Sequence, residues 1–248
     1  MRPILFHIGR LAVSSHSVLT ALAFAAAAFW AVRRGRAAGL TGRQLSLLAA
    51  AAFISMMGGA RAGYILLNWS FYHAHADQIF RFDKGGLTVF GGLIACWIVV
   101  SGILRRWRVP TGRIIDRMMP PLVLGQMIVR VGCFLQGCCY AFFTDRPWGV
   151  VFPPETRPRH PTQLYEAAAL LGILAVMLWA ERKSRRQGTS HFLIYGFLYG
   201  SFRFAVDFLR ADSSPILWGW KASQFVAFPL AGVCGLLLLR RGISCTRS

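Results

Sequence analysis

The chain has 248 residues, of which 55% are hydrophobic and 15% are charged, and its mean hydropathy is +0.49. This composition is too apolar for a typical soluble domain and indicates a membrane protein. The formal net charge of +19 is compatible with a nucleic-acid partner. However, the arginines gather between apolar segments, and no interleaved basic and aromatic motif is present. We therefore expect no nucleic-acid partner.

Seven apolar segments are long enough to cross a bilayer, which requires about 17 to 25 residues per helix. They cover residues 11–32, 45–67, 87–104, 118–136, 164–180, 191–209 and 222–239. The chain shows no internal repeat and no low-complexity linker. We therefore predict an all-α integral membrane protein with seven transmembrane helices, which forms one polytopic domain over residues 1–248.

Lysine and arginine are distributed unevenly among the connecting segments. Sixteen of the 28 lie in four segments that share one side if the spans alternate, at residues 33–43, 105–117, 181–190 and 240–248. Nine, among them Lys221, lie on the other side. The positive-inside rule then places the C-terminus in the cytoplasm and the N-terminus outside. The proline-rich segment 141–163 falls on the outer side, where we predict a small ordered cap.

The remaining three basic residues lie within predicted spans and are Arg61, Arg130 and Arg203. An ionisable group at membrane depth is costly unless it is paired or hydrated, so each is a candidate for a functional cavity. In the stretch YGSFRFAVDFLR, spacings of four, four and three place four residues on one helical face, namely Tyr199, Arg203, Asp207 and Arg210.

Glu166 supplies a second carboxylate at the outer start of the fifth predicted span. A cavity lined by three arginines and two acids is net positive, which favours binding of an anion. In a bilayer the available anions are phospholipid head groups, and the planar guanidinium suits phosphate oxygens. The alternative is that Arg203 and Asp207 form a pair that only holds helices together.

Two glycine-rich segments suggest close approach of helices or backbone. They are GGARAGY (58–64) and GGLTVFGGLI (85–94), and the second contains Gly91 and Gly92. Beside buried arginines, these glycines are consistent with a tight cleft that faces lipid.

The motifs together resemble those of the prolipoprotein diacylglyceryl transferases of bacterial inner membranes. The resemblance rests on RVGCFLQGCCYAFFTDRPWGVVF, RPRHPTQLYE, YGSFRFAVDFLR and the two glycine segments, in order from about residue 3 to residue 239. It implies a seven-span, multi-pass enzyme with a periplasmic cap. Such an enzyme moves the diacylglyceryl group of phosphatidylglycerol to the lipobox cysteine thiol of prolipoproteins. The implied partners are phosphatidylglycerol, prolipoprotein signal peptides and membrane lipids, and we expect no cofactor and no metal.

The resemblance also implies roles for individual residues. Arg130, in the RVG frame, is expected to bind lipid, and Arg203 is expected to act in catalysis on the leaving group. Arg61 corresponds to the arginine of a GGR-type motif. The other substrate-binding candidates implied are Glu166, Tyr199, Asp207, Arg210, Gln163, Gly91 and Gly92.

Three departures from the family pattern affect the proton chemistry. Phe90 stands where the family usually has a histidine, GCFLQGC replaces GNFxNGE, and His16 replaces a common tyrosine. The general base is then His160, His16 or an oxygen of the departing phosphate. The alternatives are a diverged paralogue with changed chemistry, such as a thiol-dependent acyl transferase or a redox membrane protein, and a non-catalytic phospholipid-binding protein.

Cys133, Cys138 and Cys139 leave four interpretations open: packing thiols, a disulfide, a thiol that carries the transferred group, and a metal site. Cys133 and Cys138 are roughly 140° apart on an ideal helix, so they can meet only if the helix ends between them, as Gly137 permits. The spacing matches no familiar zinc pattern. Packing is the interpretation that the sequence favours.

Overall fold

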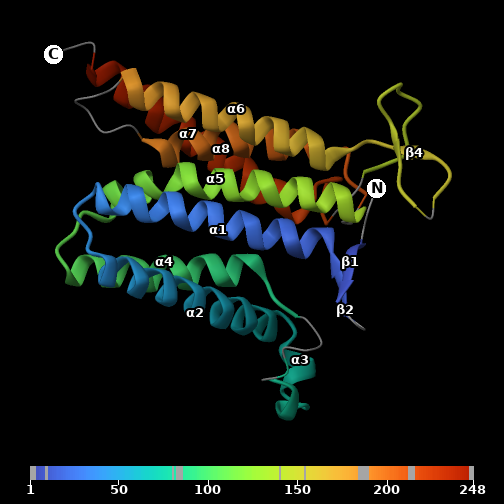
Figure 1. The fold of residues 1–248 in the computed structure, drawn as a ribbon, viewed down its shortest axis with the longest axis horizontal. Coiled ribbons are helices and arrows are strands. Elements are labelled where there is room, and N and C mark those ends of the chain that lie inside the picture. The colour runs from blue at the N-terminus through green and yellow to red at the C-terminus, as the bar shows by residue number, and fades with distance from the viewer. Residues whose placement is uncertain are drawn as a thin grey trace. The chain divides into compact units, whose positions relative to one another are not determined.

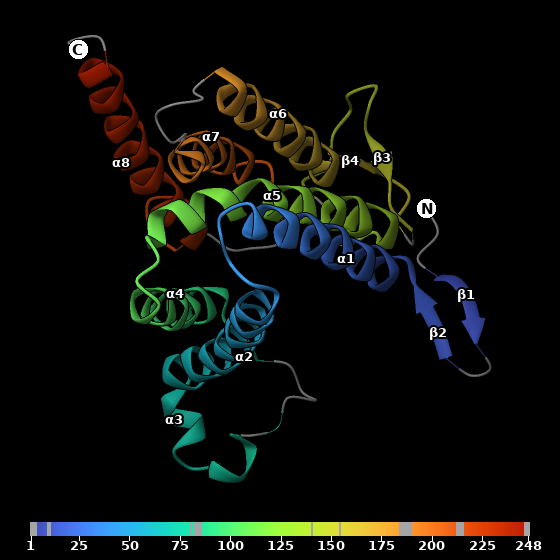
Figure 2. The ribbon, with the colours of Figure 1, turned by 60° about the vertical axis from the view of Figure 1, so that its left-hand side comes forward.

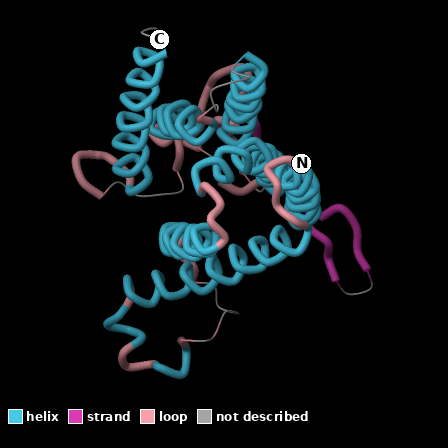
Figure 3. Tube along the Cα trace, turned by 90° about the vertical axis from the view of Figure 1, so that its left-hand side faces the viewer, coloured by secondary structure: helices cyan, strands magenta, loops and turns pink. Residues whose placement is uncertain are grey.

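The computed structural model describes residues 4–8, 11–79, 81, 86–139, 141–153, 155–183, 190–211 and 216–245. Helices make up most of these residues (Figure 3). The residues predicted to form the functional site all lie in the described ranges. Gly85, which opens the second glycine segment, lies outside them.

Seven long helices follow one another in the described chain. They are α1 (Ser15–Arg36), α2 (Gly42–Leu67), α4 (Val89–Arg106), α5 (Thr111–Gln136), α6 (Thr162–Lys183), α7 (His191–Val206) and α8 (Ala222–Cys245). The shorter elements are β1 (Ile4–Ile8), β2 (Leu11–Ser14), α3 (Trp69–Tyr72), η1 (Ala76–Gln78), β3 (Val150–Val151) and β4 (Pro158–Arg159).

Each predicted span coincides with one of the long helices, which confirms the all-α membrane fold. Six of the helices in the described ranges are long and apolar enough to cross a membrane, and α7 is not among them. With 16 residues, α7 is slightly shorter than a bilayer core requires. The orientation of the termini stays a prediction.

The N-terminal boundary differs from the predicted start of the first span at residue 11. Leu11–Ser14 forms β2 and pairs antiparallel with β1, with Ile4 opposite Ser14 and His7 opposite Ala12. The helix begins only at Ser15, where the Ser14 hydroxyl accepts a hydrogen bond from the backbone N–H of Ser17 at 3.1 Å. A side chain that satisfies a free N–H of the first turn fixes a helix start.

Three other helices, α2, α5 and α6, begin earlier than predicted. At α2, Thr41 accepts a hydrogen bond from the Gln44 N–H, and the Gln44 side chain accepts one from the Thr41 N–H. This capping box starts the helix at Gly42. Helix α5 begins at Thr111 and continues through Pro120 and Pro121, which are buried.

The chain divides into two compact units, residues 34–114 and residues 1–33 with 115–248. In the first unit, α2 and α4 lie side by side (Figures 1 and 2). A methyl group at Gly59 would lie 2.6 Å from the carbonyl oxygen of Gly91, and one at Gly92 would lie 2.8 Å from that of Met56. The glycine segments therefore bring these two helix backbones into contact, as small residues do between membrane helices.

The second unit contains α5, α6, α7 and α8, with α1 along α5 (Figure 2). Its core lies between α5 and α6 and is formed by Met119, Val123, Leu170, Ile173, Leu174 and Met177. Gly132 of α5 brings α1 close, since a methyl group there would lie 3.1 Å from the Cβ of Leu19. Gly200 of α7 does the same for α8, 3.0 Å from the carbonyl oxygen of Ala227. This packing gathers the functional side chains of α5, α6 and α7.

The segment between α5 and α6, where we predicted a cap, contains short strand pairings in its described residues. β3 and β4 pair antiparallel, and Phe143 and Ala141 form single bridges to Arg159 and Arg210. Phe152 is fully buried, and its ring meets that of Phe134 edge to face at 6.1 Å. The position of this segment at a membrane surface stays a prediction.

Candidate anion-binding site

The carboxylate of Glu166, in the first turns of α6, is the centre of the candidate site. Its Oε1 lies 2.9 Å from Nε of Arg130 and accepts a hydrogen bond from the Tyr199 hydroxyl at 2.6 Å. Its Oε2 lies 3.4 Å from Nη1 of Arg203 and 3.6 Å from Nη1 of Arg210. One arginine from α5 and two from the end of α7 and the turn after it therefore converge on one buried acid.

Asp207 is a second buried anchor, at the C-cap of α7. Its Oδ1 lies 2.9 Å from Nη2 of Arg203 and 3.9 Å from Nε of Arg210. Its Oδ2 accepts a hydrogen bond from the Ser223 hydroxyl at 2.5 Å. Arg203 thus spans both carboxylates, which fixes the plane of its guanidinium.

Helix α7 ends inside the stretch that was predicted to be one helical face. The helix stops at Val206, and Asp207 keeps helical backbone angles while its N–H bonds to the Arg203 carbonyl. Arg210 lies beyond the helix, in a turn closed by Lys221. The Lys221 ammonium donates to the carbonyl oxygens of Asp207, at 2.7 Å, and of Arg210.

The cluster carries an excess of positive charge. Its four cations, Arg130, Arg203, Arg210 and Lys221, face two carboxylates, which gives a formal charge of +2. The side chains of Arg130 and Arg203 are 21% and 19% exposed, whereas Glu166 and Asp207 are 1% and 0% exposed. The accessible face of the cluster is therefore cationic.

Arg130 has hydrogen-bond donors that remain available to a ligand. Within the described residues its ion-pair partner is Glu166, which it reaches through Nε, and both terminal amino groups remain for an anion. Two N–H groups of one guanidinium match two oxygens of a phosphate. The arrangement can therefore hold a phosphate group.

The structure brings together most of the predicted functional residues, namely Arg130, Glu166, Tyr199, Arg203, Asp207 and Arg210. Gln163 lies one turn before Glu166 and donates to the Cys138 carbonyl at 2.6 Å. His160 shares a hydrogen bond with the Tyr165 hydroxyl at 3.1 Å.

Three predicted residues belong to the other unit. Gly91 and Gly92 lie in the contact between α2 and α4. Arg61 is buried and donates to the carbonyl oxygens of Gln78, Ile79 and Gly86, at 2.7, 2.9 and 3.1 Å. Through these bonds Arg61 organises the connection between α2 and α4.

Two contributors to the cluster, Lys221 and Ser223, were not predicted from the sequence. Lys221 was assigned to an outer loop, but its side chain is buried under the end of α7. A local signal exists, because the Lys221 N–H bonds to the Gln224 side chain at 2.9 Å, three residues on, as at a helix start. Ser223 carries no such signal, since its partner Asp207 is brought near only by the fold.

The three cysteines of the GCFLQGCC stretch form a second polar group beside this site. Helix α5 ends at Gln136, and the sulfur atoms of Cys133, Cys138 and Cys139 all lie within 4.8 Å of one another as free thiols. The Nδ1 of His16 lies 3.9 Å from Sγ of Cys133. The predicted condition for their meeting, a helix end before Cys138, is therefore met.

The environment of these thiols favours charge on Cys139. A hydrogen bond from the Cys133 thiol lowers the pKa of Cys139 to about 5, against the opposing effect of burial. The positive charges of Arg210 and Arg130 act in the same direction as the hydrogen bond. Burial, by contrast, raises the pKa of Cys138.

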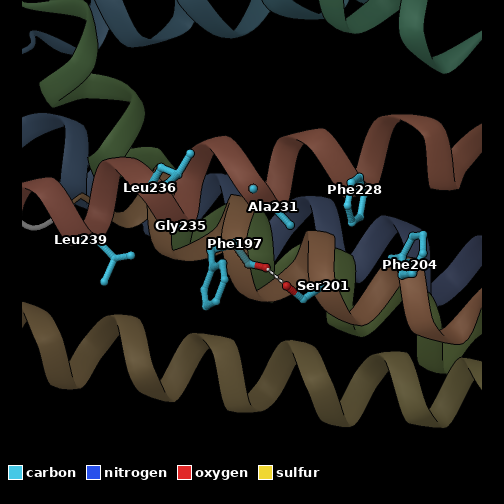
Figure 4. Close-up of a pocket in the computed structure, with 9 residues that line it drawn as sticks. Phe197, Ser201, Phe204, Phe228, Ala231, Gly235, Leu236 and Leu239 are labelled. Atoms are coloured by element: carbon cyan, nitrogen blue, oxygen red, sulfur yellow. Dashed lines mark hydrogen bonds between the residues drawn. The ribbon is translucent and has the colours of Figure 1, made fainter.

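An apolar groove of about 540 Å³ runs between α7 and α8 (Figure 4). It is lined by Phe197, Ser201, Phe204, Phe228, Ala231, Gly232, Gly235, Leu236 and Leu239. Its one hydroxyl, on Ser201, donates back to the Phe197 carbonyl at 2.7 Å. These lining residues carry no charge, so the groove offers no cationic group to an anion.

Comparison with known proteins shows the family of this chain. Residues 3–240 match the family model described as prolipoprotein diacylglyceryl transferase. A Geobacter sulfurreducens protein is 32% identical over 92% of this chain and 90% of its own length. A relative from Dehalococcoides mccartyi is 32% identical over 96% of this chain and 93% of its own length. A relative from Nitratidesulfovibrio vulgaris is 34% identical over 82% of this chain and 79% of its own length. All three are named phosphatidylglycerol–prolipoprotein diacylglyceryl transferase. The chain is a multi-pass membrane protein that belongs to the prolipoprotein diacylglyceryl transferase family.

Proposed function

We propose that the protein transfers the diacylglyceryl group of phosphatidylglycerol to the lipobox cysteine of a prolipoprotein in the bacterial inner membrane. The sulfur of the substrate cysteine forms a bond to the glyceryl carbon while the bond from that carbon to the phosphate oxygen breaks. The electron pair stays on glycerol phosphate, which leaves, and the thiol proton is released. The product is a thioether.

The observation that carries this proposal is the convergence of Arg130, Arg203 and Arg210 on Glu166. Negative charge grows on the phosphate oxygen as the carbon–oxygen bond breaks. Fixed cationic donors at that position stabilise the charge without having to reorganise. Arg130 and Arg203 are the partly exposed members, so we assign phosphate contact to them.

The buried acids and Tyr199 act as positioning residues. Without Glu166 and Asp207, mutual repulsion would drive the guanidinium groups apart. Tyr199 holds one Glu166 oxygen, and its ring stacks on Tyr195 at 4.9 Å. The Tyr195 hydroxyl in turn donates to Gln126 at 2.8 Å, which ties the network to α5.

We assign the thiol proton to an oxygen of the departing phosphate. Phe90 offers no base, and both Glu166 oxygens are already engaged by donors. His160 stays a second candidate, and its partner among the described hydrogen bonds of its side chain is Tyr165. A cationic site also favours the thiolate form of an incoming cysteine.

The test is turnover of purified protein in vesicles that contain phosphatidylglycerol, with a lipobox peptide as acceptor. Arg203→Gln and Arg130→Gln should each lower kcat by about 10²- to 10³-fold, as loss of one charge-stabilising donor does. Arg33→Gln is the matched control, because Arg33 is exposed and contacts only Phe29 among its described interactions, at 4.2 Å from the ring centroid. Near-normal turnover in both cluster variants would refute the proposed site.

A further inference from the structure

Three thiols converge where α5 ends, an imidazole lies beside one of them, and the proposed reaction uses none of these groups. Cys133, Cys138 and Cys139 place their sulfur atoms within 4.8 Å of one another, and His16 of α1 approaches Cys133 at 3.9 Å. Cysteine and histidine are the ligands that thiophilic metal ions select.

The backbone is folded to produce this convergence. Gly137 and Cys139 have φ values of +77° and +62°, and a left-handed conformation at a non-glycine residue costs about 1 kcal/mol or more. The first turn of α6 holds the strained segment, because Thr162 and Gln163 donate to the carbonyl oxygens of Cys139 and Cys138, at 3.2 and 2.6 Å. A strained turn held in place by side-chain hydrogen bonds is typical of a ligand-binding segment.

We propose that Cys133, Cys138, Cys139 and His16 bind one Zn²⁺ ion. In a tetrahedral site with zinc–sulfur bonds of about 2.3 Å, neighbouring sulfurs are about 3.8 Å apart. The sulfur atoms here lie within 4.8 Å of one another, so the widest pair needs to close by no more than about 1 Å. The corresponding nitrogen–sulfur separation is about 3.6 Å, close to the 3.9 Å between His16 and Cys133.

The local charge also suits this ion. Three thiolates and one Zn²⁺ leave a net charge of −1, which is costly to bury without a cation nearby. Arg210 and Arg130 lie close enough to Cys139 to act on it electrostatically. The arginines that would repel a bare cation instead balance the occupied site.

Four protein ligands fill the coordination sphere of zinc, so the ion would be structural. Cys133 lies three residues after Arg130 on α5, and Gln163 lies three residues before Glu166 on α6. An ion at the cluster would lock the turn between these helices and connect it to α1 through His16. The site does not depend on the proposed reaction, because occupancy is measured without turnover.

The experiment is metal titration of the full-length protein, purified in detergent under reducing conditions and stripped with a chelator. Co²⁺ serves as the spectroscopic probe. We expect one Co²⁺ per chain, the intense absorption of thiolate ligation, and displacement by an equimolar amount of Zn²⁺. Zinc should also protect three of the six cysteines from a thiol reagent in the unmodified protein.

Variants assign the ligands. Cys139→Ser and Cys133→Ser should weaken Zn²⁺ binding at least a hundredfold, while Cys96→Ser and Cys234→Ser, outside the cluster, should leave it unchanged. His16→Ala should weaken it less and alter the Co²⁺ spectrum. Three results would each overturn the proposal. They are the absence of thiolate absorption in the unmodified protein, unchanged Zn²⁺ binding in Cys139→Ser, and a disulfide that forms within the cluster despite equimolar Zn²⁺.

Discussion

Arg130 and Glu166 join α5 to α6 through a contact of 2.9 Å in which the acid is buried and the guanidinium remains partly exposed. This asymmetry gives the two residues different tasks. The carboxylate is an internal anchor for three arginines, whereas the Arg130 side chain stays partly accessible. We propose that a site built in this way binds an anion without losing its own ion pairs.

Glu166→Gln should destabilise the protein by about 3–5 kcal/mol, because it leaves buried positive charge without its partner. Thermal unfolding in detergent measures this, and turnover with phosphatidylglycerol should fall at the same time. Glu181→Gln is the matched control, since Glu181 is 40% exposed near the other end of the same helix. Equal stability of the two variants would contradict the anchoring role of Glu166.

Tyr199→Phe should have a smaller effect that is confined to the site. The ring and its stacking on Tyr195 are kept, and only the hydroxyl that donates to Glu166 is lost. A hydrogen bond to a charged group contributes about 1.5–3 kcal/mol, so we expect turnover to fall about 10- to 100-fold. Tyr195→Phe loses the bond to Gln126 instead and should retain more activity.

Sequence periodicity predicted much of this site because its parts lie on regular elements. Tyr199 and Arg203 share a face of α7, and Glu166 marks the start of α6. Lys221 was not predicted, because its partners are backbone carbonyls that only the turn after α7 brings near. The meeting of Cys133 with Cys138 was left open for a similar reason, since it depends on the end of α5 at Gln136 and on the left-handed Gly137 that follows.

The predicted topology has a direct test. The basic segments 33–43, 105–117, 181–190 and 240–248 should face the cytoplasm. After Arg240, a reporter that functions only in the cytoplasm should then be active. At Arg146, a reporter that functions only outside the cytoplasm should be active. Periplasmic activity of the first fusion would reverse the orientation.

The contact between α2 and α4 provides the last prediction. A methyl group at Gly91 would lie 2.4 Å from the carbonyl oxygen of Gly59, a backbone atom that cannot rotate away. Gly91→Ala should therefore push the helices apart and lower stability by about 1–3 kcal/mol, the usual cost of overpacking.

Gly102→Ala is the matched control on the same helix, because nothing lies within 4 Å of the added methyl group. Alanine favours a helix over glycine by up to about 1 kcal/mol, so this variant should be neutral or slightly more stable. We would measure both the stability against unfolding and the affinity for phosphatidylglycerol in the two variants. The pair of measurements also tests the predicted substrate role of Gly91. If Gly91→Ala kept full stability but lost lipid affinity, the glycine would be needed for substrate rather than for helix packing.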